Sequence, residues 1–182
     1  FAKAGLGSAI LFEKNPFEAL RLFDQAVKLG VPRSYVASDR GLAFDFIGNN
    51  QLAQQDYRLA LAGEKSDELL RRYAVSLGIS GKREEAEATL NPLLQKRDPA
   101  AWRARAFILA MNGDRRGANV IIDATMPKKL AAAVRPFMRQ VPKLSSAQRA
   151  AAIHFGHFPA TSKVGVDLPR VQSASGRQYA SA

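Results

Sequence analysis

Two stretches of this chain carry the same pattern of small and aromatic residues, 34 residues apart. Gly7 recurs as Gly41, and in both copies an alanine, an aromatic residue and a second alanine follow at identical spacing. These residues are Ala19, Phe23 and Ala26 in the first copy and Ala53, Tyr57 and Ala60 in the second. A period of this length is typical of a repeated pair of short helices, which buries its apolar face only by stacking on its neighbours. We therefore expect an all-α chain built from such pairs.

The pattern continues with drift in two further copies. Their first small residues are Ala74 and Ala106, which follow 33 and 32 residues after the preceding ones. Turn-forming residues separate the two helices of every copy, and these are Asn15-Pro16, Gly48-Asn49-Asn50, Gly81-Lys82 and Gly113-Asp114. The spacing predicts four helix–turn–helix repeats over residues 1–126, at about 1–32, 33–65, 66–98 and 99–126. Ser34 is the expected N-cap of its helix, and Pro92 is expected to bend or shorten its helix.

This spacing resembles that of the tetratricopeptide repeat (TPR) family. Trp102, four residues before Ala106, stands where that family has a tryptophan, whereas Pro32 and Pro99 lie one position later than the family's proline. The resemblance implies a right-handed α-solenoid of about four repeats. It also implies that the first helix of each repeat lines a concave groove, in which a partner protein or peptide binds.

Carried over position by position, the resemblance predicts a set of groove residues that is largely apolar and aromatic. The set is Phe12, Tyr35, Leu42, Asp45, Phe46, Arg71, Val75, Arg103, Phe107 and Met111. Aromatic residues beside arginines are common at the energetic centres of interfaces, and arginine binds carboxylates through two hydrogen bonds. We therefore predict a non-enzymatic scaffold whose partner presents apolar and acidic residues. The competing interpretation is that the aromatic residues pack between repeats and the arginines are solvated.

The repeat pattern stops after Pro127. Leu130, Val134 and Phe137 predict one more amphipathic helix, and a helix at about 145–155 follows, capped by Ser145 or Ser146. Because a solenoid needs atypical end units to cover its last apolar face, we expect residues 127–158 to form a capping helix pair. From residue 159 to residue 182, Ser, Gly, Ala and scattered basic residues predict a flexible basic linker.

A second resemblance involves the fourth repeat together with Leu144-Ser145 and the run from His154 to Pro159. It is similar to a group of alphaproteobacterial TPR proteins related to the pilus-assembly lipoproteins of the tight-adherence system, some of which precede a peptidoglycan-binding SPOR domain. The resemblance implies an exported protein of the periplasm or cell envelope with a place in pilus assembly. A cytoplasmic location stays open, because the chain begins with Phe1 and we expect a processed chain or part of a longer one.

The positive charge is concentrated in the C-terminal third. The net charge of the chain is +11, yet residues 127–182 hold nine Lys and Arg and a single acidic residue, Asp167. The alternative function is therefore electrostatic binding of a polyanion, such as nucleic acid, anionic lipid or a cell-wall polymer. The composition argues against nucleic acid, because it lacks the interleaved basic and aromatic residues of single-strand binders.

Other chemistry finds little support in the sequence. There is no cysteine, and no nucleophile elbow, phosphate-binding loop or zinc-protease motif occurs, so we expect no catalysis and no cofactor. His154 and His157 have a spacing that metal ligands use, but no third ligand is near them in sequence and we expect no metal. No apolar run is long enough for a transmembrane helix. The oligomeric state stays open, because the exposed end face of the first repeat near Phe1 and Leu6 could pair with a second copy.

Overall fold

In the computed structural model, the described residues are 1–63, 65–160 and 163–165. Every regular element in these ranges is helical, which confirms the all-α prediction. The elements are α1 (Ala2–Phe12), α2 (Pro16–Lys28), α3 (Arg33–Phe46), α4 (Asn50–Gly63), α5 (Asp67–Ile79), α6 (Arg83–Gln95), α7 (Pro99–Met111), α8 (Arg115–Thr125), α9 (Lys128–Gln140), the short 3-10 helix η1 (Val141–Lys143) and α10 (Ser146–Phe155).

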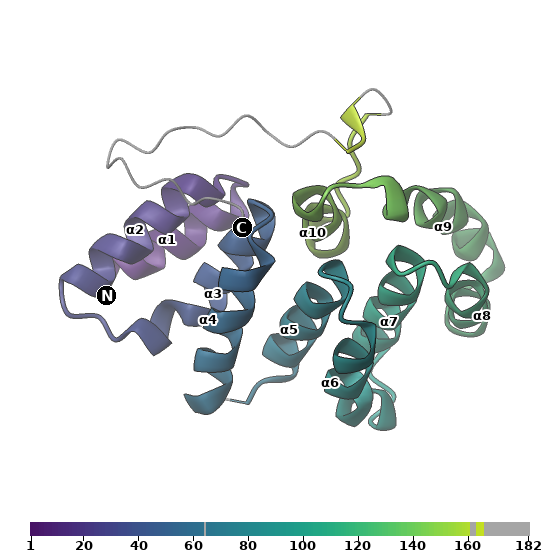
Figure 1. Ribbon diagram of the computed structural model, residues 1–182, viewed down its shortest axis with the longest axis horizontal. Helices are drawn as coiled ribbons and strands as arrows, with labels where there is room; N and C mark the ends of the chain where they lie inside the picture. The colour runs from purple at the N-terminus through teal and green to yellow at the C-terminus, as the bar shows by residue number, and fades with distance from the viewer. Residues whose placement is uncertain (64, 161–162, 166–182) are drawn as a thin grey trace.

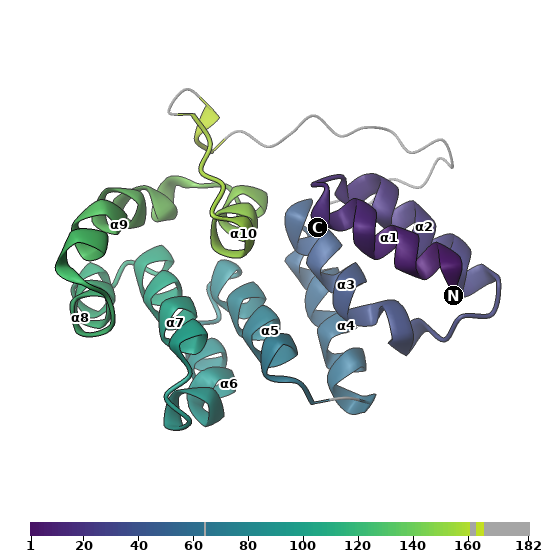
Figure 2. The same cartoon turned by 180° about the vertical axis from the view of Figure 1, so that it is seen from behind.

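The first eight helices pack as four successive pairs, α1 with α2, α3 with α4, α5 with α6 and α7 with α8. Neighbouring pairs stack on each other and form an arc, which both views of the ribbon show (Figures 1 and 2). The core is a continuous cluster that runs through this arc, and Phe23, Tyr57, Leu90 and Ile122 are fully buried at corresponding places in the second helix of each pair. The arrangement is therefore that of a helical repeat.

The turn within each pair repeats its backbone geometry. Lys14, Gly48, Gly81 and Gly113 have φ of 65°, 80°, 81° and 89°. After each of them, the next amide donates a hydrogen bond to the carbonyl five residues back, for example Asn49 to Phe44 at 2.8 Å and Asp114 to Leu109 at 2.9 Å. This left-handed region favours glycine, so three of the four turns use it. These residues have the same 34-, 33- and 32-residue spacing as the small residues of the sequence pattern.

Glycine allows the two helices of a pair to approach in the first two repeats. A Cβ added to Gly7 would lie 2.7 Å from the Phe23 ring, and one added to Gly41 would lie 2.8 Å from the Tyr57 ring and 3.2 Å from the Ala53 carbonyl. The equivalent aromatic residue of each repeat thus packs directly over the glycine. The recurring small residue of the sequence pattern therefore lies at a close helix contact in both repeats.

Gly41→Ala is expected to lower the free energy of unfolding by about 1–3 kcal/mol, because the added methyl group overpacks the contact with Tyr57. Gly5→Ala is the matched control, since Gly5 lies inside α1 with nothing within 4 Å of an added Cβ. That variant is expected to gain up to about 1 kcal/mol from helix propensity. Urea denaturation measures both values, and two variants of equal stability would contradict the packing argument.

Two local predictions are wrong. Ser34 is not the N-cap of α3. The helix begins at Arg33 with Pro32 in the N-cap position, and the Tyr35 amide donates to the Pro32 carbonyl at 3.0 Å. Pro92 does not shorten α6, which continues to Gln95. Leu93 beside it is fully buried, and this burial offsets the cost of a proline inside the last turns.

A buried ion pair joins the helices of the second repeat. The Nε and Nη2 atoms of Arg40 on α3 donate to the two carboxylate oxygens of Asp56 on α4, each at 2.7 Å. Arg33 Nη2 donates to the same carboxylate at 3.1 Å. The Asp56 side chain is 0% exposed and that of Arg40 is 8% exposed. Both charges are therefore out of water and depend on each other.

The chain after the fourth pair turns back along the array. We call residues 128–158 the return segment. Its helix α9 packs on α8 and α7, η1 packs on α7, and α10 packs on α3 and α5. The predicted cap pair on the last repeat is therefore only half right, since α10 lies against the second and third repeats (Figure 1). Most of the predicted linker 159–182 lies outside the described residues, and Gly165, which is described, donates its amide to Gln148 of α10 at 2.8 Å.

Candidate functional site

The return segment crosses the C-terminal ends of the first helices of the repeats, on the inner side of the arc (Figure 2). The Phe155 ring at the end of α10 stacks on the Phe46 ring of α3, with centroids 4.7 Å apart and an interplanar angle of 21°. The Phe155 ring also packs against the Phe12 ring of α1 in a T-shaped arrangement, with centroids 6.4 Å apart. At the other end of α10, Ala147 lies beside Gly48, since a Cβ added to Gly48 would be 3.8 Å from the Ala147 Cβ. A helix of the chain itself thus occupies the surface that the sequence predicts as a groove.

The ten predicted groove residues divide into three groups by exposure. Leu42, Asp45, Phe46, Val75 and Met111 are buried, Arg71 and Phe107 are half-buried, and Phe12, Tyr35 and Arg103 are exposed. The structure brings Phe12 and Phe46 together around Phe155, whereas Tyr35 packs against Phe1 at 5.2 Å. Of the predicted set, only Phe12, Tyr35 and Arg103 are exposed, and they lie on three different helices, α1, α3 and α7.

Asp45 differs from its predicted role on the groove surface, because it is 0% exposed. Its carboxylate accepts hydrogen bonds from Ser76 Oγ at 2.7 Å, Asn50 Nδ2 at 2.6 Å and the Tyr57 hydroxyl at 3.0 Å. Burial raises the pKa of Asp45 to about 7, although these three hydrogen bonds act in the opposite direction. Asp45 therefore links α3, α4 and α5 inside the array.

Two neighbouring arginines of α5 already hold carboxylates of the chain. Arg71 Nη1 donates to Asp98 at 2.5 Å, and Asp98 is the N-cap of α7. Arg72 Nη1 donates to Asp39 of α3 at 2.9 Å, and Arg72 Nη2 donates to Glu68. The Arg71–Asp98 and Arg72–Asp39 pairs join α5 to α7 and to α3. Arg71 is therefore already paired within the chain, whereas Arg103 is exposed.

The sequence did not indicate the two half-buried polar residues of α10, His154 and Arg149, each of which has a buried side-chain nitrogen. His154 packs edge-on against Phe46 at 6.0 Å between ring centroids, and its Nε2 atom is buried without a hydrogen-bond partner. Burial, assisted by the positive charge of Arg72, lowers the pKa of His154 to about 4. The capping box of Ser145 and Gln148 marks this helix in the sequence. No local signal shows which surface the helix covers, because that depends on contacts about a hundred residues away.

Arg149 of α10 is a second polar group at this contact. Its Nη2 donates to the Pro142 carbonyl at 2.9 Å and its Nη1 reaches the Ile79 carbonyl, at the end of α5, at 3.4 Å. Its Nε atom is buried without a partner, and burial lowers the pKa of Arg149. The side chain therefore places positive charge at the C-terminal end of α5, where the helix dipole favours a cation.

The structure brings together no metal site in the residues that it describes. His157 is exposed at the end of the return segment while His154 is buried, so the two histidines do not share a surface. No group of three or more His, Cys, Asp or Glu side chains within the described ranges could hold a metal ion. None of the described helices is long and apolar enough to span a membrane.

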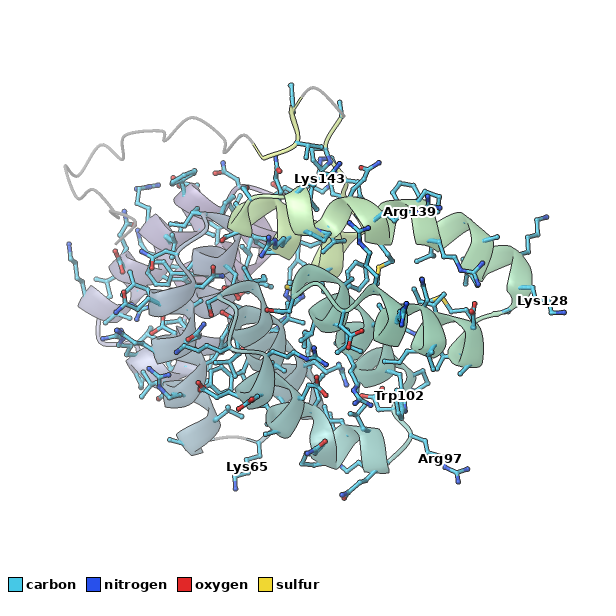
Figure 3. All side chains as sticks on the ribbon, turned by 45° about the vertical axis from the view of Figure 1, so that its right-hand side comes forward. Lys65, Arg97, Trp102, Lys128, Arg139 and Lys143 are labelled. Atoms are coloured by element: carbon cyan, nitrogen blue, oxygen red, sulfur yellow. The ribbon has the colours of Figure 1, made fainter. Side chains whose placement is uncertain are left out.

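Basic residues line the outside of the return segment. Lys128, Arg139 and Lys143 follow α9 and the turn after it, at the edge of the molecule opposite Lys65 and Arg97 (Figure 3). All three of these residues are exposed. Residues 127–165 contain seven Lys and Arg and no Asp or Glu, so this edge is strongly positive. It lies outside the contact that α10 makes with α3 and α5.

Comparisons with known proteins identify no relative. No family model matches the chain, and no curated protein or solved structure matches it. The likeness to TPR proteins therefore rests on the residue spacing and on the recurring turns of this chain, and functional argument rests on the surfaces described above.

Proposed function

We propose that this protein is a non-enzymatic interaction scaffold of the TPR type, whose inner surface binds a helical segment of a partner protein. One observation carries the proposal: α10 lies against α3 and α5 with Phe155 stacked on Phe46. A surface that accommodates a helix of the chain itself has the shape and the aromatic anchor that a partner helix needs. The 34-, 33- and 32-residue recurrence of the turns supports a TPR-type solenoid of right-handed twist.

The chemistry of the exposed residues favours a partner segment with small residues, at least one aromatic side chain and an acidic group. A small residue would fit where α10 has Ala147, whose Cβ lies 3.8 Å from a Cβ added to Gly48. An aromatic side chain would meet Phe12, which is 56% exposed, and a carboxylate would pair with the exposed Arg103. The resemblance to pilus-assembly proteins supports a place for this scaffold at the cell envelope.

Selection from a displayed library of helical peptides tests the proposal. We expect enriched peptides to have an aromatic residue and small residues at one-turn spacing. A selected peptide should bind Phe12→Ala about tenfold more weakly, the cost of an aromatic contact at an interface. Leu29→Ala is the matched control, because Leu29 is 71% exposed and ends α2, the second helix of its pair. Equal losses in both variants, or none in either, would contradict binding at the inner surface.

The basic edge of the return segment supports a second candidate function, the binding of a polyanion. The observation in its favour is the absence of any acidic residue over 127–165 together with the exposed row of Lys128, Arg139 and Lys143. Binding of this kind weakens steeply with salt, whereas contact with Phe12 should tolerate salt. Binding to anionic vesicles that is lost both at high salt and in a Lys128→Ala/Arg139→Ala variant would support this candidate; binding that persists in either case would exclude it.

A further inference from the structure

The two parts of the return segment differ in how firmly they are held. In η1 and the residue after it, Val141 and Leu144 are 0% and 3% exposed and anchor the segment. The only buried residues of α10 are Ala150 and Ala152, whose side chains are single methyl groups. Besides these, Ile153 and Phe155 of α10 are half-buried and pack against the core. Since apolar stabilisation scales with the area removed from water, the apolar gain of α10 comes from two methyl groups and two partly buried side chains. The boundary between the anchored part and the weakly held part is Ser145, the N-cap of α10.

The contact of α10 with α3 and α5 also leaves polar side-chain atoms without hydrogen bonds. His154 Nε2 and Arg149 Nε are buried without hydrogen-bond partners, and both belong to this one helix. Each such group costs free energy that an undocked helix recovers from water. The charged groups facing this contact are Arg72, which is paired with Asp39 and Glu68, and Arg149. A small apolar gain and two unpaired polar atoms together describe a contact that is easily exchanged.

We propose that α10 is a displaceable lid over the inner surface, and that the segment which displaces it is a helix with an apolar side chain where α10 has His154. This inference rests on the proposed function. It assigns the occupant of the surface by chemistry: small residues against Gly48 and α5, an aromatic ring on Phe46, and an apolar residue beside that ring. Such a helix makes the contacts of α10 and leaves no imidazole nitrogen unpaired.

A disulfide that holds the lid closed tests this directly in the full chain. A Cβ at position 48 lies 3.8 Å from the Ala147 Cβ, which is close to the usual Cβ separation in a disulfide. Gly48→Cys/Ala147→Cys should therefore link the α3–α4 turn to α10, and the chain has no other cysteine. Cysteine at position 48 is strained by its φ of +80°, but the strain is common to the oxidised and reduced forms, so their comparison is unaffected.

The probe is a fluorescent peptide with the sequence of residues 144–158 and the substitution His154→Leu. We expect it to bind the reduced double-cysteine protein at a concentration of roughly 0.1 mM, since α10 competes at a millimolar effective concentration, to lose binding after oxidation and to regain it with reductant. It should bind Phe155→Ala, in which the lid is weakened, at least tenfold more tightly than the wild type. The peptide with His154 retained should bind about tenfold more weakly than the leucine peptide, which is the effect of one unpaired buried polar group.

The outcomes separate the lid from the proposed function. Equal binding to the oxidised and reduced forms would show that α10 does not cover the peptide site, and the lid inference would be wrong. Binding to Phe155→Ala alone, with none to the wild type or the reduced protein, would show that α10 is a permanent part of the fold while the surface still binds helices. No binding to any form, Phe155→Ala included, would overturn the proposed function as well. Gly48→Cys alone is the control, and its binding should not respond to oxidation.

Discussion

Replacing Arg40 with leucine is expected to lower the free energy of unfolding by about 4 kcal/mol, the largest loss expected from any single substitution described for this protein. The substitution leaves the Asp56 carboxylate, which is 0% exposed, with Arg33 as its one remaining ion-pair partner. Arg33 contributes a single contact at 3.1 Å from a side chain that is 53% exposed. An incompletely compensated charge in the core is costly because the interior solvates it poorly.

Urea denaturation followed by far-ultraviolet circular dichroism measures this effect. Arg21→Leu is the matched control, because Arg21 pairs with Glu18 on the exposed side of α2. Its loss is expected to be much smaller than that of Arg40→Leu, because solvent screens surface ion pairs. If the two variants lose similar amounts, the Arg40–Asp56 pair does not stabilise the second repeat in the way its burial indicates.

His154→Leu is expected to change the pH dependence of stability by about 2 kcal/mol between pH 5 and pH 7. The reason is that Asp45 and His154 change the free energy of unfolding in opposite directions as the pH rises. The pKa of Asp45 is raised from 3.8 to about 7 in the fold. Its contribution to stability is therefore full below 3.8 and is lost as the pH rises to about 7. The pKa of His154 is lowered from 6.5 to about 4, so its contribution is full above 6.5 and is lost as the pH falls toward 4.

Each group alone changes stability by about 1.4 kcal/mol per pH unit in its window. Because the two slopes have opposite signs between about pH 4 and pH 6.5, the wild type should change by less than about 1 kcal/mol from pH 5 to pH 7. Without His154 the slope of Asp45 remains, and the variant should lose about 3 kcal/mol over the same range. His157→Leu, which removes the exposed histidine, should keep the flat profile of the wild type. A flat profile for His154→Leu would show that the pKa of Asp45 is not raised in the fold, and a wild type as steep as the variant would show that His154 is not held neutral.

Local features of the sequence predicted the helices well because their causes are local. The ends of α5 and α8 follow from Ser66, Asp114 and the turn glycines, whose caps and backbone geometry involve residues only a few positions away. The repeat spacing identified Gly7, Gly41, Phe23 and Tyr57 as repeated positions, and the structure adds that each aromatic ring packs over the glycine of its own repeat. The two errors at Ser34 and Pro92 arise where packing or a neighbouring proline overrides a local preference.

The candidate site was less predictable because it depends on contacts between distant parts of the chain. The spacing placed Asp45 on a surface, but its three hydrogen-bond donors come from α4 and α5 and enclose it. The sequence marked a helix at 145–155 but could not place it, since the Phe155–Phe46 stack joins residues more than a hundred positions apart. Arg71 was expected to meet a partner and instead pairs with Asp98, the N-cap of α7.

The anchored residues Val141 and Leu144 have a quantitative consequence for any helix that competes with α10. When α10 detaches from α3 and α5, its short connection to Val141 and Leu144 keeps it nearby, and such short linkers give effective concentrations in the millimolar range. A free helix present at micromolar concentration must therefore bind about a thousandfold more tightly than α10 itself to occupy half of the sites. Helices of modest affinity would therefore not displace α10 even when they are abundant. The covalent attachment of α10 would in this way make the scaffold selective without any repulsive contact.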